Sequence, residues 1–196
     1  MYQFIESICC LEGEAKLLRQ HQARVDSTFA NFFPQNSPLD LNSTVQNIPS
    51  KGKYKCRLLY DAVSFSVEYQ PYKTSDISSL QVVHDNHIDY KFKSTNRSPL
   101  DSLYEQRSEA DDIIIIRNGL VTDSYYANLA FFDGTEWWTP ESPLLEGIKR
   151  AFLLDKNRIK TKNIYEKDLS SFIKVSLINA MLDLGEVEIP VDRITP

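Results

Sequence analysis

The alternation of apolar and polar positions predicts that the first part of the chain is rich in strands. Residues 4–11 are predicted to form a strand closed by a turn at 12–13. Residues 54–60 and 65–69 each place apolar side chains on one strand face and mainly polar ones on the other. Between these segments, apolar side chains recur at helical spacing and predict a helix over about residues 14–33. Antiparallel hairpins combined with one helix indicate an α+β domain.

The second half of the chain contains short apolar runs separated by turn residues. The β-branched run at 112–116 is typical of a buried strand, and residues 127–132 predict a second strand. Asp133-Gly134 is a hairpin signal, and residues 137–140 predict a third strand. Residues 144–150 lead into a helix. This order favours a mixed α/β arrangement in the second half.

A polar stretch at residues 71–78 separates the two parts and contains a proline. It is the best candidate for a linker. The sequence therefore predicts a small α+β domain over 1–70, a linker over 71–78 and a larger α/β domain over 79–196.

Composition and charge narrow the class of protein. At 196 residues the chain can bury a real core, and 42% hydrophobic with 25% charged residues is the balance of an ordinary globular protein. The net charge of -5 gives no reason to expect nucleic acid or an anionic membrane as a partner. No apolar run reaches the roughly 18–20 residues of a membrane span, and the start of the chain lacks a signal-peptide pattern. We therefore expect a cytoplasmic protein.

The three cysteines do not predict a metal site. Cys9, Cys10 and Cys56 fit no metal-ligand spacing and are odd in number. Reduced structural thiols are the expected state in the cytoplasm. His84 and His87 have no metal partners at sensible spacing and are expected to lie in loops.

One acid and one helix start in the second half suggest a particular kind of ligand. Asp123 follows the first predicted strand, and Gly147-Ile148 begins the predicted helix. A helix N-terminus offers free backbone N–H groups to an anion. The pair suits a ligand with a protonated ring nitrogen at one end and a phosphate at the other.

The same residues carry a resemblance to a known family. Gly119, Val121-Thr122-Asp123, Asn128-Leu129, Thr139-Pro140 and Leu145-Glu146-Gly147-Ile148-Lys149-Arg150 resemble the pattern of the class IV aminotransferases. These are pyridoxal-phosphate (PLP) enzymes of fold type IV, which include branched-chain and D-amino-acid aminotransferases and 4-amino-4-deoxychorismate lyase. Asp123 stands where most members have Glu, and Lys149 where they have Thr.

The resemblance implies which lysine binds the cofactor. In the lyase and its relatives the Schiff-base lysine lies three residues before an Asn-Arg pair, and Lys93 has that relation to Asn96-Arg97. Lys93, in the larger domain, is therefore the implied Schiff-base lysine and general acid/base. Lys91 is the alternative, since it would share a strand face with Lys93. Without the resemblance, either lysine would be taken for a solvated strand charge.

The resemblance also implies the rest of the cofactor site. His21-Gln22-Ala23-Arg24 matches a helix signature whose Arg contacts the phosphate, although spacing alone favours a solvated helix arginine. Asp123 would hold the ring nitrogen protonated, and Leu145 would support the ring. The implied cofactor-binding set is Arg24, Lys93, Asp123, Asn128, Leu145, Gly147, Ile148 and Lys149.

Substrate and reaction remain open between alternatives. The Lys-x-x-Asn-Arg form favours the lyase, which converts 4-amino-4-deoxychorismate to 4-aminobenzoate and pyruvate in folate biosynthesis. There Ser7 would stand for a catalytic Thr, and Arg57 would bind a substrate carboxylate or else be a surface arginine. The alternatives are an aminotransferase acting on branched-chain or D-amino acids, and a non-catalytic PLP-fold binding protein.

The implied architecture is the two-domain fold type IV, similar to D-amino-acid aminotransferase, with a shortened N-terminus. The chain begins near the family's second strand. The implied assembly is a homodimer acting on a small, amino-acid-like substrate.

Overall fold

The computed structural model describes residues 3–196, and their contacts divide them into two compact units. Unit 1 comprises the described residues up to Thr74 together with Phe92–Asn96, and unit 2 comprises Ser75–Lys91 and Arg97–Pro196. The predicted division assigned all of residues 79–196 to the second domain. The structure differs, because the segment that contains Lys93 belongs to unit 1.

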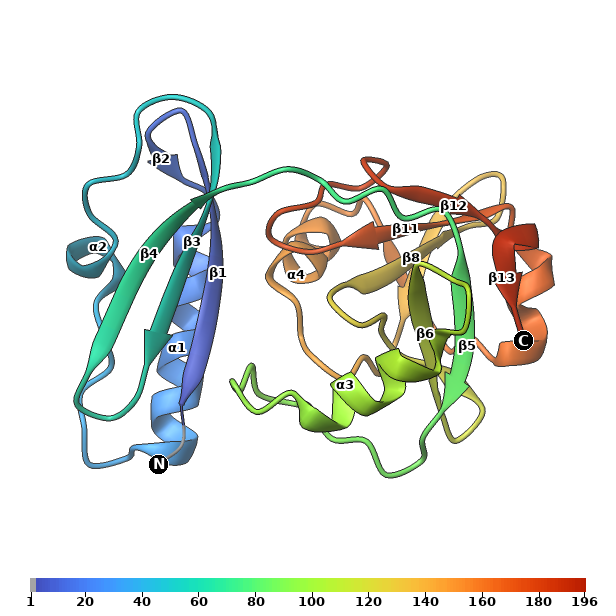
Figure 1. Cartoon of the computed structure of the whole chain (residues 1–196), viewed down its shortest axis with the longest axis horizontal. Coiled ribbons are helices and arrows are strands. Elements are labelled where there is room, and N and C mark those ends of the chain that lie inside the picture. The colour runs from blue at the N-terminus through green and yellow to red at the C-terminus, as the bar shows by residue number, and fades with distance from the viewer. Residues whose placement is uncertain (1–2) are drawn as a thin grey trace. The chain divides into compact units, whose positions relative to one another are not determined.

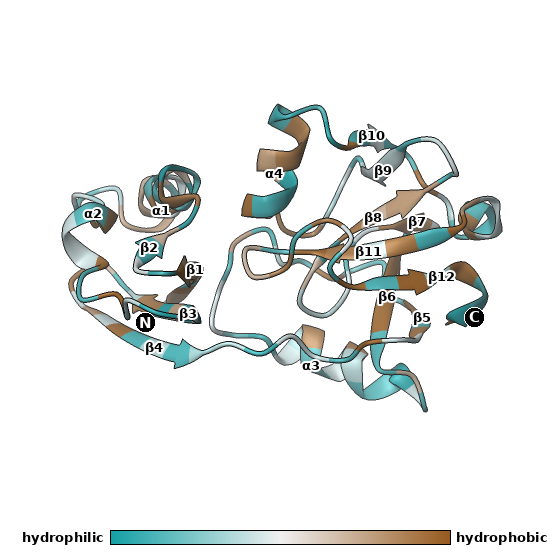
Figure 2. Cartoon of the chain, turned by 90° about the horizontal axis from the view of Figure 1, so that it is seen from above, coloured by the Kyte–Doolittle hydropathy of each residue, from teal (hydrophilic) through white to brown (hydrophobic). Residues whose placement is uncertain are grey.

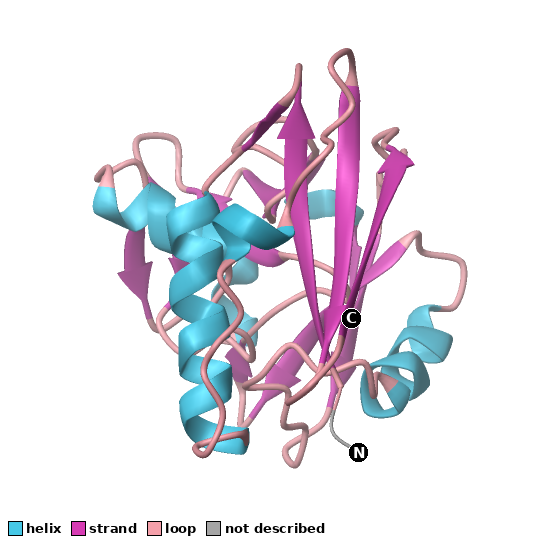
Figure 3. Cartoon of the chain, turned by 90° about the vertical axis from the view of Figure 1, so that its left-hand side faces the viewer, coloured by secondary structure: helices cyan, strands magenta, loops and turns pink. Residues whose placement is uncertain are grey.

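Unit 1 is a four-stranded antiparallel sheet with the strand order β2-β1-β3-β4 (Figure 1). One long helix, α1, runs alongside the sheet (Figure 3). The elements are β1 (Phe4–Leu11), β2 (Glu14–Ala15), α1 (Leu18–Phe32), α2 (Leu41–Thr44), β3 (Lys53–Tyr60) and β4 (Phe65–Pro71).

The core of unit 1 follows from the alternation in the sequence. One face of β1 and β3 carries side chains that are almost fully buried, and the apolar stripe of α1 packs against that face. The residues that make this contact are Phe4, Ile8, Cys10, Cys56, Leu58, Tyr60, Val25 and Phe29. All three cysteines are buried and form no disulfide.

The helix predicted over residues 14–33 begins later than expected. Glu14 and Ala15 pair with Leu11 and Cys10 as the short strand β2, and the helix starts at Leu18. Gly13, with a φ of +83°, reverses the chain into this hairpin. Residues 14 and 15 are not part of the helix, because their backbone pairs with β1.

The segment around Lys93 is a loop and not the strand assumed from its sequence. The backbone N–H of Ile5 donates a hydrogen bond to the carbonyl oxygen of Lys93 at 3.0 Å. Ser94 forms a single antiparallel bridge with Phe4. The ring of Phe92 packs edge-on against Phe32 at 4.8 Å between centroids. These contacts assign the loop to unit 1.

Unit 2 contains two sheets, with the orders β10-β9-β8-β11-β12 and β13-β5-β6-β7. Its strands are β5 (Leu80–His84), β6 (Asp112–Arg117), β7 (Leu120–Val121), β8 (Asn128–Phe132), β9 (Trp137–Pro140), β10 (Lys160–Lys162), β11 (Lys174–Ile178), β12 (Glu188–Pro190) and β13 (Ile194–Thr195). Its helices are α3 (Ser98–Tyr104), η1 (Glu105–Arg107), α4 (Ile148–Asp155), η2 (Glu166–Ser171) and η3 (Val191–Arg193).

The centre of unit 2 is β6, as its apolar run predicts. Its four consecutive isoleucines are fully buried, and Figure 2 shows the strand in the brown of hydrophobic residues. Leu100 and Leu103 of α3 belong to the same core cluster as Ile113 and Ile115. Leu153 of α4 packs instead with Ala130 of β8 and Ile178 of β11. The α+β fold class is therefore confirmed.

Two elements of unit 2 are short. β10 covers only Lys160–Lys162, and Glu166–Ser171 form the 3₁₀ helix η2. Ser98 is the first residue of α3, and Arg97 is at its N-cap. Within residues 3–196 no helix is long and apolar enough to cross a membrane. No cluster of three or more metal-ligating side chains occurs in that range.

Candidate cofactor site

Asp123 is a buried carboxylate that accepts two hydrogen bonds and forms no ion pair with a basic side chain of residues 3–196. It follows β7, and its oxygens accept from Asn128 Nδ2 at 2.7 Å and from the backbone N–H of Leu145 at 2.9 Å. Burial raises the pKa of Asp123 to about 6, against the opposing effects of these hydrogen bonds and of the Arg150 charge. An ionised carboxylate in such a place is costly unless a cation joins it. Its remaining lone pairs leave room for one more donor.

Asn128 ties this acid to the start of α4. Its amide nitrogen donates both to Asp123 and to the carbonyl oxygen of Leu145, the latter at 2.9 Å. A Cβ added to Gly147 would lie 1.8 Å from Asn128 Oδ1, so only glycine fits beside this amide. The close approach brings the acid, the amide and the helix start into one compact arrangement.

The start of α4 presents backbone N–H groups, as the sequence predicts. Gly147 is the N-cap residue, and the first helical hydrogen bond runs from Ala151 to the Gly147 carbonyl. The N–H groups of Ile148, Lys149 and Arg150 therefore have no acceptor within the helix. Such groups can hold a phosphate.

The two cations on α4 already have protein partners. Lys149 Nζ donates to Asp183 Oδ1 at 2.5 Å. Arg150 donates to the Pro140 carbonyl at 2.8 Å and to Glu146 at 2.9 Å, while its buried Nε has no partner within residues 3–196. A phosphate role for Lys149 would need its ammonium to leave Asp183.

In unit 1 the predicted phosphate ligand Arg24 is held by a carboxylate that sequence reasoning missed. Arg24 donates to both oxygens of the fully buried Glu6, at 2.8 Å from Nε and 2.6 Å from Nη2. The same carboxylate lies 2.5 Å from His21 Nδ1. The sequence does contain a signal for this ion pair, because Glu6 lies on a strand face whose other residues are apolar.

Arg24 and His21 stabilise the buried negative charge of Glu6. Although burial alone would raise it, the pKa of Glu6 is lowered to about 2 by Arg24 and His21. Burial lowers the pKa of His21, and the positive charges of Arg24 and Lys93 lower it further, against the opposing effect of Glu6. His21 is therefore neutral at pH 7, and its buried Nε2 has no hydrogen-bond partner in the part of the chain that the structure describes.

The predicted substrate residues Ser7 and Arg57 lie directly opposite each other on β1 and β3. Directly opposite residues have side chains on the same face of a sheet. Glu6 and Arg24 lie on the other face, because consecutive strand residues alternate. Unit 1 therefore brings the two predicted substrate residues together and keeps them apart from Arg24.

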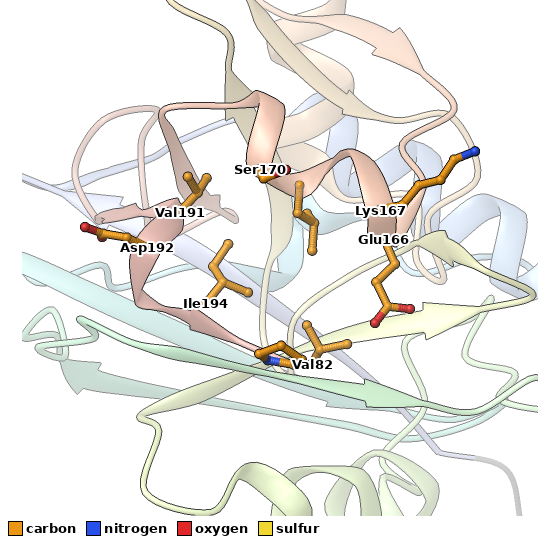
Figure 4. Close-up of a pocket in the computed structure, with 9 residues that line it drawn as sticks. Val82, Glu166, Lys167, Ser170, Val191, Asp192 and Ile194 are labelled. Atoms are coloured by element: carbon orange, nitrogen blue, oxygen red, sulfur yellow. The ribbon is translucent and has the colours of Figure 1, made fainter.

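Unit 2 contains a cleft between β5, η2, η3 and β13. It has a volume of about 450 Å³ and is lined mainly by apolar side chains with acidic and basic groups at its rim (Figure 4). Its lining includes Val82, Leu169, Val191 and Ile194, together with Glu166 and Lys167. It contains none of the predicted site residues.

The sequence matches the model of one protein family over almost its whole length. The family is described as amino-transferase class IV, and the match covers residues 3–189. The chain belongs to the class IV aminotransferase family. This confirms the resemblance, and it supports an enzyme of fold type IV.

Individual relatives agree with the family assignment. A protein of Haemophilus influenzae with uncharacterised function is 32% identical over 185 residues, which cover 92% of this chain and 98% of the relative. A crystal structure from Haemophilus somnus, named as a candidate 4-amino-4-deoxychorismate lyase, is 33% identical with a TM-score of 0.88. That match covers 94% of this chain and 98% of the other.

A more distant structure shows the fold alone. A hypothetical aminotransferase from Mycobacterium tuberculosis, solved in a PLP-bound form, is 15% identical with a TM-score of 0.78. That match covers 98% of this chain and 81% of the other.

Class IV aminotransferases depend on PLP, and the residues of unit 2 fit that group. Asp123 has the burial, the raised pKa and the open acceptor position that a protonated ring nitrogen would complete. Gly147 lets the Asn128 amide that holds Asp123 approach the start of α4, because a Cβ there would lie 1.8 Å from Asn128 Oδ1. The helix start beside it offers N–H groups to a phosphate.

Proposed function

We propose that this class IV aminotransferase-family enzyme is a PLP-dependent lyase that converts 4-amino-4-deoxychorismate to 4-aminobenzoate and pyruvate. The observation that supports this choice most is the 33% identity, over 94% of the chain, to a structure named as a candidate lyase of this kind. The Lys93-x-x-Asn96-Arg97 spacing agrees with it.

Each residue has a defined task in this proposal. Lys93 would bind PLP, with Lys91 as the alternative, and Asp123 would keep the ring nitrogen protonated. Asn128 and the Leu145 N–H hold the carboxylate of Asp123 in place. The N–H groups of Ile148 and Lys149 would hold the phosphate, together with Arg24. Leu145 would support the ring.

PLP, when bound, supplies an electron sink for the carbon that carries the substrate amine. The amine of Lys93 would remove a proton from that carbon, as a general base. The carbon–oxygen bond to the enolpyruvyl group then breaks, the departing group takes up a proton as pyruvate, and the remaining ring becomes aromatic. The two products contain all the atoms of the substrate, so no co-reactant is required.

Ser7 and Arg57 would serve the substrate. They lie opposite each other in the sheet of unit 1, and no ion pair of Arg57 occurs within residues 3–196. A cation without a carboxylate partner can bind a substrate carboxylate. The Ser7 hydroxyl beside it can donate to or accept from the same substrate.

The test is to incubate the purified protein with PLP and 4-amino-4-deoxychorismate and to measure 4-aminobenzoate and pyruvate. We expect both products in equal amounts, and neither with Lys93→Ala. Formation of a keto acid from a branched-chain or D-amino acid, without 4-aminobenzoate, would instead identify an aminotransferase. A protein that stays colourless with PLP would indicate a non-catalytic member. Sedimentation would test the homodimer that the family implies.

A further inference from the structure

Arg97 is a half-buried cation surrounded by tyrosine rings. Its guanidinium carbon lies 4.5 Å from the ring centroid of Tyr125, 4.6 Å from that of Tyr126 and 5.5 Å from that of Tyr90. Its Nη2 donates to the backbone carbonyl of Tyr125 at 2.7 Å. No carboxylate forms an ion pair with Arg97 in the part of the chain that the structure describes. Its interactions are therefore directed at the segment that carries Tyr125.

That segment is the turn that connects Asp123 to Asn128. Ser124 and Ala127 close it, with the Ser124 N–H donating to the Ala127 carbonyl at 2.9 Å. Asp123 and Asn128 then form an isolated antiparallel bridge across its base. Any movement of this turn displaces the carboxylate and the amide together.

Three side chains from outside the turn hold its backbone. Arg97 binds the Tyr125 carbonyl, Asp112 Oδ1 accepts from the Tyr125 N–H at 3.3 Å, and Asn179 Nδ2 donates to the Tyr126 carbonyl at 3.3 Å. Of these three contacts, the one from Arg97 is the shortest and the only one made by a positive charge. Charged donors give the stronger hydrogen bonds.

Helix α3, which begins directly after Arg97, holds the Tyr125 side chain as well. Tyr125 donates its hydroxyl to Asp101 Oδ1 at 2.5 Å, and its ring stacks on Tyr104 at 4.2 Å between centroids. The Arg97 guanidinium lies over the Tyr125 ring. Tyr125 is thus fixed at its backbone, its ring and its hydroxyl.

We propose that Arg97 is a positioning residue that fixes the Asp123–Asn128 turn, and through it the carboxylate that faces the cofactor ring. The proposal rests on the proposed function for the cofactor, but the positioning itself is a property of the protein alone. A planar guanidinium can stack on two rings while donating to a carbonyl, and a lysine ammonium cannot do both. The task therefore requires arginine.

Arg107 provides a matched control in the same unit. Its guanidinium carbon lies 4.2 Å from the Tyr104 ring centroid, and its Nη1 donates to the Tyr104 carbonyl at 3.1 Å. It therefore makes the same two kinds of contact, but with helix α3 and not with the turn. Arg107→Ala should leave Asp123 in place.

The first experiment is amide hydrogen exchange on the protein without PLP. We expect Arg97→Ala to accelerate exchange at the Tyr125 and Leu145 amides by roughly tenfold, since these amides donate to Asp112 and Asp123. Arg97→Lys should give a smaller acceleration and Arg107→Ala none. Unchanged exchange at both amides would overturn the proposal. Equal acceleration at the Leu177 amide of β11 would also overturn it, because the effect would then be general loosening.

The second experiment compares PLP with its 1-deaza analogue, in which carbon replaces the ring nitrogen. We expect Arg97→Ala and Asp123→Asn to weaken binding of PLP several-fold and to leave binding of the analogue unchanged, because the analogue has no ring nitrogen for Asp123 to meet. Equal weakening of both ligands by Arg97→Ala would contradict the positioning role. If the unaltered protein does not bind PLP, the proposed function fails, and the exchange result still decides whether Arg97 fixes the turn.

Discussion

Asn128 and Gly147 approach each other so closely that no side chain fits at position 147. A Cβ there would lie 1.8 Å from Asn128 Oδ1. The backbone of Gly147 has a φ of -72°, which any residue can adopt. Glycine is thus required by the contact with Asn128, and the same amide holds Asp123.

Replacing Gly147 should disturb both stability and cofactor binding. Gly147→Ala forces the Asn128 amide away from Asp123, and overpacking of this kind costs about 1–3 kcal/mol. We expect a free energy of unfolding lower by that amount in urea titrations, and weaker PLP binding in absorbance titrations.

A second substitution separates the contact from other effects. Adding Asn128→Ala to Gly147→Ala removes the clash, so stability should partly recover while PLP binding stays weak. Gly119→Ala is a comparison, because that glycine has a φ of +78° and no neighbouring atom within 4 Å. It should cost about 1 kcal/mol through backbone strain and leave PLP binding unchanged. A Gly147→Ala protein as stable as the original would refute the contact.

The raised pKa of Asp123 predicts an unusual pH dependence for the protein without PLP. The pKa is about 6 in the folded protein against an ordinary 3.8, so the folded state keeps a proton that the unfolded chain has released. The contribution of Asp123 to stability should therefore fall as pH rises from about 4 to 6, by up to about 3 kcal/mol. Urea unfolding at a series of pH values measures this slope.

Two substitutions and the addition of PLP test whether Asp123 causes this pH dependence of stability. Burial also raises the pKa of Asp112 to about 6, so Asp123→Asn and Asp112→Asn should each remove part of the slope. Bound PLP should remove the Asp123 part, because a ring cation keeps that carboxylate ionised. A slope that survives both substitutions together would show that other groups cause it.

Glu6 should contribute stability in the opposite direction and in a lower pH range. Its pKa is about 2 in the folded protein against an ordinary 4.5, so its contribution is complete above pH 4.5 and lost as pH falls towards 2. Glu6→Gln leaves Arg24 and His21 without their buried partner, and we expect a loss of about 3 kcal/mol at pH 7. The difference from the original protein should vanish near pH 2. Glu14→Gln, which breaks an exposed pair with Lys16, should leave stability almost unchanged.

Patterns local in the sequence predicted the elements around Asp123. The isoleucine run gave β6, the turn at Asp133-Gly134 gave the β8–β9 hairpin, and Gly147 does begin α4. Each depends on neighbours a few residues away. Burial then follows from composition, because β-branched runs have no polar face to expose.

Features that depend on distant residues were not predicted. Loop 92–96 joins unit 1 through backbone contacts with residues about 90 positions earlier, and periodicity carries no trace of them. Arg24 was expected to bind a phosphate, and the sequence analysis did not predict its hydrogen bonds to Glu6. The position of Glu6 on an otherwise apolar strand face could have indicated this contact. Arg97 looked like part of a spacing motif, and only the structure shows its tyrosine surroundings.

The most direct test of this account is to identify the lysine that binds PLP. Borohydride reduction fixes PLP to the amine that holds it, and peptide mass spectrometry then identifies the modified residue. We predict the modification at Lys93, its loss in Lys93→Ala and its persistence in Lys91→Ala. Modification at Lys91, or none at either lysine, would contradict the central claim.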